Sequence, residues 1–219
     1  TAAEIAPAPC RLRPMMVTSD VAAELKRLGV ADVDDSSLAR ALYSTDASLY
    51  RVVPHVVVRP RHVEEVLATV AACRATDTPL TSRGAGTSIA GNAVGTGVVL
   101  DFSRHLNRVH DIDVEARTAR VDPGTVHAVL QRAATPLGLR FGPDPSTHTR
   151  CTVGGMIGNN ACGSRALAYG RTADNVIGLD VVTTAGEELS LSAGGATMSP
   201  TLDRLRDVMA DGLGTVRTE

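Results

Sequence analysis

Aromatic side chains are scarce in this chain: it has three Tyr, two Phe and no Trp among 219 residues. Charge of one sign is not in excess either, because 22 Lys and Arg residues face 24 Asp and Glu residues and leave a formal net charge of −2. Proteins that bind nucleic acid present a basic surface, and those that bind single strands add aromatic rings on which bases stack. The composition therefore argues against a nucleic-acid partner.

The sequence also has no long apolar run. Its apolar stretches are far shorter than the roughly 20 residues that a membrane-spanning helix needs. The first residues do not show the apolar stretch of a secretory signal peptide. The chain starts with Thr rather than Met, so we expect its N-terminus to be a boundary set either by expression or by processing.

Cysteine and histidine form no pattern typical of disulfides or metal sites. The cysteines show no C-x-x-C pair and no disulfide-dense spacing; they are Cys10, Cys73, Cys151 and Cys162. We therefore expect reduced thiols in a cytoplasmic protein. The six His residues form no H-x-H or H-x-x-x-H pattern, so the spacing predicts no metal site.

The sequence does contain regular apolar patterning, which begins with an N-terminal helical segment over residues 1–54. Residues 18–50 read as helices that open on Ser and Asp caps, and the first of them ends at Gly29. Residues 55–103 then predict a first subdomain with parallel strands around a right-handed crossover. Its expected strand, helix, strand and strand cover residues 55–60, 61–77, 79–84 and 97–103. One face of that helix carries Val63, Val66, Leu67 and Val70.

Residues 104–192 predict a second subdomain with antiparallel strands. Alternating segments indicate a hairpin over 108–124 and another over 175–192 that turns at Ala185 and Gly186. Between them a helix over 125–138 places on one face Val126, Val129, Leu130, Ala133 and Leu137. The tail, 193–219, predicts a helix that starts at Ser199 and Pro200 and has on one face Leu202, Leu205 and Met209. The predicted fold class is α+β, with two small α/β subdomains that meet near two glycine-rich stretches.

The first of these stretches is "SRGAGTSIAGN", residues 82–92, directly after a predicted strand. It does not fit the dinucleotide fingerprint G-x-G-x-x-G, because Ile89 stands at the third glycine position. It does not fit the P-loop either, because Asn92 and Ala93 stand where Lys and Ser or Thr are required. The loop still has anion-binding chemistry, since glycines let successive backbone N–H groups approach one phosphate. A tight connection between strands is the alternative interpretation.

Side chains of the same loop could support an anion. Thr87 and Ser88 add hydroxyl donors, and Arg83 adds a positive charge. Arg83 is equally well interpreted as a solvated residue at the end of a strand.

The second stretch is "GPDPSTHTRCTVGGMIGNNACGS", residues 142–164. It reads as a loop that runs into a short helix of small residues, whose N-terminus favours negative charge. Asn159 and Asn160 can each donate and accept hydrogen bonds. Two such stretches suit a long ligand with a central diphosphate, whereas the alternative is two unrelated tight turns.

These two stretches carry a resemblance to a known family. "PLTSRGAGTSIAGNAVGTGVVLDFSRHLNRV" and "GPDPSTHTRCTVGGMIGNNACGSRALAYG" resemble the FAD-binding domain of the vanillyl-alcohol oxidase/p-cresol methylhydroxylase (PCMH) type. Within the FAD-linked oxidases the sequence is most similar to the D-lactate dehydrogenase and glycolate oxidase branch. "NNACGSRALAYG" resembles members that carry an iron–sulfur domain further along a longer chain, so a cluster is expected only in a longer parent.

The resemblance implies FAD as the ligand of both stretches. The pyrophosphate is expected against the backbone of residues 83–88, with Asn92 close by. The segment at Pro143 and Asp144, together with 152–155, is expected to line the flavin and ribityl region. The implied cofactor-binding residues are Ser82, Arg83, Gly84, Ala85, Gly86, Thr87, Ser88, Asn92, Pro143, Asp144, Thr152, Val153, Gly154, Gly155, Gly158, Asn160, Ala161 and Gly163.

The resemblance also bears on how the flavin is held. No His lies in 82–92, so we expect non-covalent FAD. Cys151 and Cys162 are each expected to be small buried residues rather than anchors. His148 is expected to be a loop residue without a catalytic task.

By resemblance, the parent protein oxidises a small D-2-hydroxy acid, such as lactate or glycolate, by hydride transfer to flavin N5. The family's catalytic residues lie mostly in a cap domain downstream, so no catalytic residue is predicted within this chain. We expect the chain by itself to be inactive and to hold FAD poorly or not at all. The alternatives are a reductase of the UDP-N-acetylenolpyruvoylglucosamine type and a non-catalytic flavin-binding or electron-transfer module. Peripheral membrane association of the parent is compatible with the resemblance, and the electron acceptor and oligomeric state do not follow from the sequence.

Overall fold

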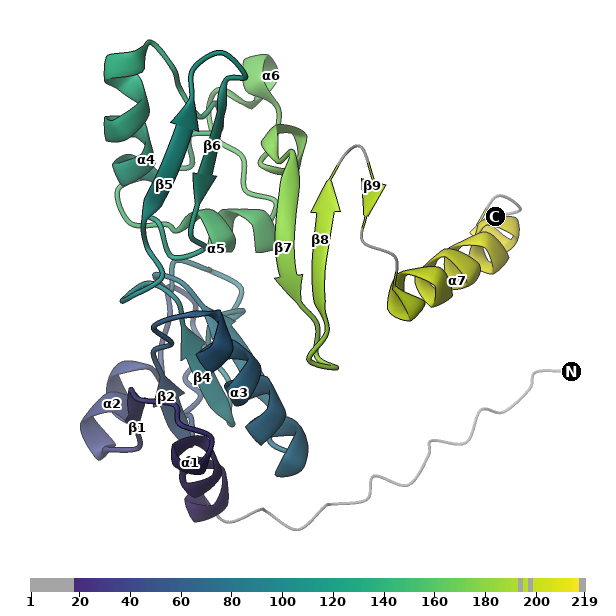
Figure 1. Cartoon of the computed structure of the whole chain (residues 1–219). Helices are drawn as coiled ribbons and strands as arrows, with labels where there is room; N and C mark the ends of the chain where they lie inside the picture. Colours follow the sequence, from purple (N-terminus) through teal and green to yellow (C-terminus); the bar gives the residue numbers. More distant parts are fainter. Residues whose placement is uncertain (1–17, 193–194, 197–198, 217–219) are drawn as a thin grey trace, which may run out of the picture.

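The computed structural model of the chain describes residues 18–192, 195–196 and 199–216, and it divides most of them between two lobes (Figure 1). The first lobe contains α1 (Thr18–Arg27), β1 (Val33–Asp34), α2 (Ser37–Leu42), β2 (Val56–Val58), α3 (Val63–Ala75), β3 (Leu80–Arg83) and β4 (Val98–Asp101). The second lobe contains β5 (Val109–Asp113), β6 (Thr118–Val121), α4 (His127–Ala134), α5 (Val153–Gly158), α6 (Ala166–Tyr169), β7 (Gly178–Val182) and β8 (Glu188–Ser192), with short 3₁₀ turns at Thr135–Leu137 and Ala173–Asn175. The short strand β9 (Gly195–Ala196) and the helix α7 (Pro200–Val216) follow it.

A mixed sheet in the order β1-β2-β4-β3 forms the core of the first lobe. Strand β4 pairs in parallel with both β2 and β3, which confirms the predicted parallel unit, whereas β1 adds an unpredicted antiparallel edge. Residues 56–58 and 98–100 are at most 1% exposed. Such continuous apolar burial is typical of parallel strands that are covered on both faces.

Helix α3 packs against this sheet through a face that differs from the expected one. Val66 and Val70 are buried as predicted, but Val63 is 45% exposed. Glu65 and Thr69 are buried instead, because their polar atoms find partners: the Glu65 carboxylate accepts hydrogen bonds from the Ala31 and Arg61 N–H groups. The spacing of apolar residues cannot identify a buried helix face on which some side chains are polar and hydrogen-bonded.

The predicted helical span 18–50 is only partly helical. Helix α1 stops as expected before Gly29, whose φ is +82°, and α2 ends at Leu42. Residues 43–50 form a loop, because Asp46 and Ser48 accept hydrogen bonds from the N–H groups two residues further along the chain. Such local side-chain bonds compete with the helical hydrogen-bond pattern.

In the second lobe the two predicted hairpins are confirmed. Strand β5 pairs antiparallel with β6, and β7 pairs antiparallel with β8 around a turn in which Gly186 has a φ of +80°. The predicted face of the intervening helix is partly wrong, because Val129 and Leu137 are 36% and 44% exposed. The buried residues of α4 are His127, Leu130 and Ala134.

Helix α7 lies beyond β9 and apart from both lobes (Figure 1). Its predicted start is confirmed: Pro200 is its first residue, and the Ser199 hydroxyl accepts a hydrogen bond from the Thr201 N–H. Leu205 and Met209 are more than half exposed and Leu202 is partly buried, so most of the predicted apolar face is not buried against the described part of the chain.

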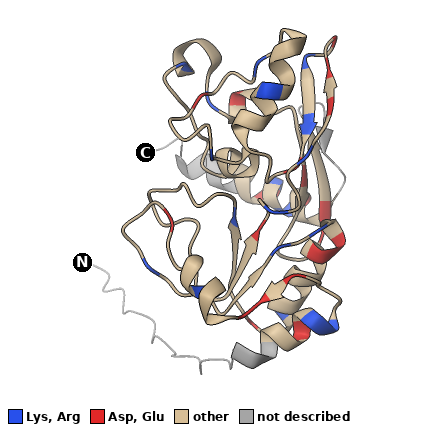
Figure 2. Ribbon diagram, turned by 90° about the vertical axis from the view of Figure 1, so that its left-hand side faces the viewer, with Lys and Arg blue, Asp and Glu red and all other residues tan. Residues whose placement is uncertain are grey.

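Charged residues of both signs are spread over both lobes (Figure 2). Among the described residues, no helix is both long enough and apolar enough to span a lipid bilayer.

Candidate functional site

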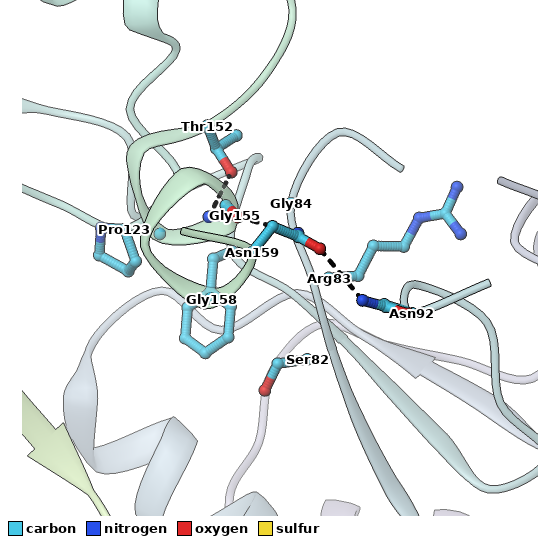
Figure 3. Close-up of a pocket in the computed structure, with 11 residues that line it drawn as sticks. Ser82, Arg83, Gly84, Asn92, Pro123, Thr152, Gly155, Gly158 and Asn159 are labelled. Carbon is cyan, nitrogen blue, oxygen red and sulfur yellow. Dashed lines mark hydrogen bonds between the residues drawn. The ribbon is translucent and has the colours of Figure 1, made fainter. Parts of the chain in front are cut away.

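A pocket of about 290 Å³ lies where the two glycine-rich stretches meet (Figure 3). It is lined by Ser82, Arg83, Gly84, Asn92, Phe102, Pro123, Thr152, Gly154, Gly155, Gly158 and Asn159. Residues from the end of β3, from the loop after it and from α5 therefore come together, as the sequence predicted for the two stretches. The sequence did not predict Phe102, Pro123 or Asn159 as cofactor-binding residues.

The two stretches pack directly against each other at Gly84, which contacts the side chain of Thr152. A Cβ atom at this position would overlap the Thr152 side-chain oxygen. Thr152 is 2% exposed and is the N-cap of α5. Gly154 packs in the same manner against Pro123, with only 2.8 Å between its ideal Cβ position and the Pro123 Cβ. Glycine is therefore needed at both positions because other segments of the same chain pack closely against them.

The N-terminus of α5 is not open to an anion, contrary to expectation. The Val153 N–H donates to the Thr125 carbonyl and the Gly154 N–H donates to the Pro123 carbonyl, each at 2.8 Å. The Gly155 N–H donates to the Thr152 hydroxyl at 3.3 Å. Protein acceptors thus occupy the donors that the helix would otherwise offer to a phosphate.

The loop after β3 offers the donors that α5 lacks. In the described part of the chain, the backbone N–H groups of residues 84–89 have no protein acceptor. Gly86 has a φ of +66°, in the left-handed region that favours glycine. Residues 84–97 include no acidic side chain that would repel an anion. A run of unpaired N–H groups in a glycine-rich turn is typical of anion-binding loops.

The guanidinium of Arg83 is held by the protein. It donates to the Thr45 and Ala93 carbonyls, each at 2.9 Å, and lies over the Tyr43 ring with its central carbon 5.1 Å from the centroid. Its side chain points away from Thr152 and Gly155 (Figure 3). Arg83 is thus neither a solvated strand end nor a free cation.

An amide–amide hydrogen bond crosses the pocket between the two stretches. The Asn92 side-chain N–H donates to the Asn159 side-chain oxygen at 3.0 Å, and Asn159 itself donates to the Gly155 carbonyl at 3.0 Å (Figure 3). Asn160, the amide expected at the cofactor, has a φ of +45° and accepts from the Ala173 N–H instead.

Residues 54–192, more than half of the chain, match the model of the FAD binding domain. The chain belongs to the FAD-binding domain family. Its cofactor is therefore FAD, and the α+β fold class predicted from the sequence is confirmed.

Curated relatives of this FAD-binding domain include two longer oxidoreductases. The glycolate oxidase subunit GlcD of Bacillus subtilis is 39% identical over 176 residues, which cover 78% of this chain and 37% of the relative. The D-2-hydroxyglutarate dehydrogenase of Escherichia coli is 38% identical over 170 residues, which cover 76% of this chain and 17% of the relative. The chain thus spans well under half the length of these relatives.

Among solved structures, an alkyldihydroxyacetonephosphate synthase aligns with a TM-score of 0.69. The alignment covers 83% of this chain and 36% of that chain, at 24% identity. This similarity supports the fold.

The pocket and the adjoining loop fit part of an FAD molecule. The unpaired donors of residues 84–89 suit its diphosphate, and the glycines around the pocket leave little side chain between ligand and backbone. A volume of about 290 Å³ is at the small end of ligand pockets, so FAD would extend beyond it along the loop.

Several of the expected FAD-binding residues do not line the pocket. Asp144 accepts from the Arg165 N–H at 3.1 Å and forms an ion pair with the Arg165 side chain at 3.1 Å. Gly163 packs against the Asp144 backbone. The "GPDP" and "NNACGS" segments therefore hold each other beside the pocket. The expected residues outside its lining are Ala85, Gly86, Thr87, Ser88, Pro143, Asp144, Val153, Asn160, Ala161 and Gly163.

His127 fixes the backbone of the first of these segments. It is 2% exposed, its Nε2–H donates to the Pro143 carbonyl at 2.8 Å, and its Nδ1 has no partner in the described structure. Burial lowers the pKa of His127 below its ordinary value of about 6.5. The folded protein therefore holds this ring neutral where the unfolded chain would protonate it.

This pKa shift predicts a pH-dependent stability. Near and below pH 6.5 the unfolded state binds more protons than the folded state. The contribution of the neutral His127 ring to the free energy of unfolding is therefore fully present above pH 6.5, and it is lost as the pH falls through the lower pKa of the folded state. Urea unfolding should give a smaller free energy at pH 5 than at pH 7.5, and His127→Gln should flatten this difference. His148→Gln removes the neighbouring ring, 6.2 Å away between centroids, whose charge also lowers the pKa of His127, and should therefore reduce this difference only in part. An unchanged slope in His127→Gln would exclude His127 as its source.

The cysteines differ in accessibility. Cys151 is buried as predicted, but the prediction that Cys162 is buried is wrong, because it lies exposed in the loop between α5 and α6. Burial raises the pKa of Cys73 to about 11 and also raises the pKa of Cys151. Cys10 lies outside the described residues.

Thiol labelling should follow this difference, because the thiolate is the reactive form. A maleimide should modify Cys162 in the folded protein well before Cys73 or Cys151, as mapped on peptides by mass spectrometry. Equal labelling of the three cysteines without denaturant would contradict the burial described here.

Proposed function

We propose that this FAD-binding domain serves a flavin-dependent oxidoreductase that oxidises D-2-hydroxy acids of the lactate and glycolate type. The observation that carries the proposal is the run of unpaired N–H donors at residues 84–89 beside a glycine-walled pocket. The relatives named glycolate oxidase subunit and D-2-hydroxyglutarate dehydrogenase support the substrate class.

In this proposal the N–H groups of residues 84–89 bind the FAD diphosphate. Asn92 and Asn159 bind polar groups of the cofactor where they now bond each other. The backbone at Pro143 and Asp144, which His127 and Arg165 hold in place, lines the flavin and ribityl region. When bound, FAD accepts a hydride from the substrate.

The proposal also covers the domain organisation of the chain, the way FAD is held, the cellular compartment and the partners. Residues 55–103 and 104–192 are the two FAD-binding subdomains, preceded by a helical segment and followed by a helical tail. FAD is bound non-covalently, and the cysteine pattern favours the cytoplasm. The small-molecule hydroxy acid is the substrate, and nucleic acid is not a partner.

Cofactor release tests the binding mode. The purified whole protein should be yellow, and acid precipitation should leave the flavin in the supernatant as FAD. Flavin that stays with the pellet, or FMN in the supernatant, would contradict non-covalent FAD binding. Turnover of D-lactate, glycolate or D-2-hydroxyglutarate with an artificial electron acceptor tests the substrate class, and L-lactate is the matched control. Oxidation of the L-acid alone would overturn the assignment.

A further inference from the structure

Tyr43 lies where the carboxyl ends of three parallel strands converge. Arg59 follows β2, Arg83 ends β3 and Asp101 ends β4. The two guanidinium carbons lie 5.5 and 5.1 Å from the centroid of the Tyr43 ring. The Tyr43 hydroxyl donates to the Asp101 carboxylate at 2.5 Å and accepts from Arg59 Nε at 3.4 Å. Asp101 is only 4% exposed, so this hydroxyl partners a buried carboxylate.

The residues after Tyr43 hold the glycine-rich loop along its length. The Thr45 carbonyl accepts from Arg83, and the Ala47 N–H donates to the Gly86 carbonyl at 3.0 Å. The Asp46 carboxylate accepts from the Ala93 N–H at 3.3 Å.

The end of the loop is held as well. Gly91 has a φ of +80°, and its ideal Cβ position lies 2.6 Å from the Tyr50 ring. Segment 43–50 therefore contacts the loop from its first residues to its last.

Arg83 is the central connection between this segment and the loop. Two backbone carbonyls accept from its guanidinium while the Tyr43 ring stacks on it. A planar fork with several donors suits this arrangement, and an ammonium group does not. Since Arg83 immediately precedes Gly84, its position sets where the unpaired N–H groups begin.

We propose that segment 43–50, with Tyr43 and Arg83 as positioning residues, pre-organises the loop that binds the FAD diphosphate. The segment lies before residues 54–192, which the FAD binding domain model matches. The proposal rests on the proposed function, because it assigns the diphosphate to this loop. A loop already held in its bound shape loses less conformational freedom on binding, which raises affinity.

Substitution of Arg83 separates this positioning role from a simple charge. Arg83→Lys keeps the charge and Arg83→Gln removes it, and both lose the stacked fork. Titration of the chain with FAD, followed by amide NMR shifts, should show both variants binding about tenfold or more weakly than wild type, because charge-assisted bonds and a cation–π contact are lost. Arg74→Lys and Arg74→Gln are matched controls, since Arg74 also donates to a carbonyl, that of Ala185, outside the pocket. They should bind FAD like wild type.

Substitution of Tyr43 provides a second test, in which the change in FAD affinity is separated from the change in stability. Tyr43→Phe keeps the ring that both guanidiniums contact but leaves Asp101 without the Tyr43 hydroxyl as a donor. It should lower the melting temperature yet hold FAD within about threefold of wild type, whereas Tyr43→Leu should bind about tenfold more weakly because the stacking is lost. Affinity is measured below the melting temperature of each variant.

The outcomes distinguish this proposal from the proposed function. Wild-type protein that shows no FAD-dependent shifts would remove the proposed function itself. Wild-type binding together with full affinity in Arg83→Lys would show that Arg83 acts through its charge and would overturn the positioning role. Equal loss of affinity in Tyr43→Phe and Tyr43→Leu would overturn the role of the stacked ring.

Discussion

Gly84→Ala should destabilise the protein by about 1–3 kcal/mol, the usual range for overpacking a well-packed contact. The added methyl group would overlap the Thr152 hydroxyl and lie 3.2 Å from two of its carbon atoms. Thr152 caps α5 and is almost fully buried, so it cannot move without disturbing the helix start. The clash should force the two glycine-rich stretches apart and open the pocket. Urea denaturation at equilibrium measures the loss.

Gly158→Ala is the matched control, because Gly158 lines the same pocket but has no atom within 4 Å of its ideal Cβ position. Since Gly158 lies in α5, alanine there should leave stability unchanged or raise it by up to about 1 kcal/mol. A Thr152→Ala background should reduce the cost of Gly84→Ala, because it removes the overlapping oxygen. The contact would be refuted if Gly84→Ala and Gly158→Ala lowered the free energy of unfolding by similar amounts. It would also be refuted if Gly84→Ala cost as much in the Thr152→Ala background as in the wild type.

Gly86→Val should abolish or strongly weaken FAD binding, whereas Gly29→Val should not affect it. Both glycines have positive φ, +66° and +82°, so both substitutions strain the backbone by at least about 1–2 kcal/mol. Only Gly86 lies in the loop with unpaired N–H groups, and its ideal Cβ position lies 2.5 Å from an Arg83 Nη atom. The Gly29 position meets no atom within 4 Å. Flavin fluorescence quenching measures the affinity.

The Gly29 variant controls for loss of stability at a left-handed position. Circular dichroism should show both variants folded at the temperature of the titration. If the two folded variants bound FAD equally well, the loop would have no role in holding the cofactor.

The order of the helices and strands could be predicted from the sequence because the spacing of apolar residues and the positions of the turn-forming glycines indicate the same elements. The valine runs of β2 and β4 and the stops at Gly29 and Gly186 indicate their elements without knowledge of the tertiary structure. The errors arise where polar groups replace apolar ones in buried positions. Glu65 and His127 are buried because backbone groups from elsewhere in the chain pair with them. No local pattern shows those partners.

The glycine spacing located the candidate site but could not assign a task to each glycine. Gly84 and Gly154 serve packing between protein segments, whereas Gly86 adopts a left-handed conformation. Arg83 reads as a cation for phosphate until the structure shows the carbonyls around it. Phe102 could have been found from the rule that ligands bind at the carboxyl ends of parallel strands, since it directly follows β4.

In the proposed function, the unpaired N–H groups of residues 84–89, and not the N-terminus of α5, bind the FAD diphosphate. A titration of ¹⁵N-labelled protein with FAD tests it most directly, because each backbone N–H gives its own signal and weak binding is visible. We predict downfield amide proton shifts concentrated at residues 84–89, with smaller changes at Val153, Gly154 and Gly155, whose N–H groups already have protein acceptors. Large shifts confined to those three amides, with residues 84–89 unchanged at saturation, would place the diphosphate at the N-terminus of α5 instead.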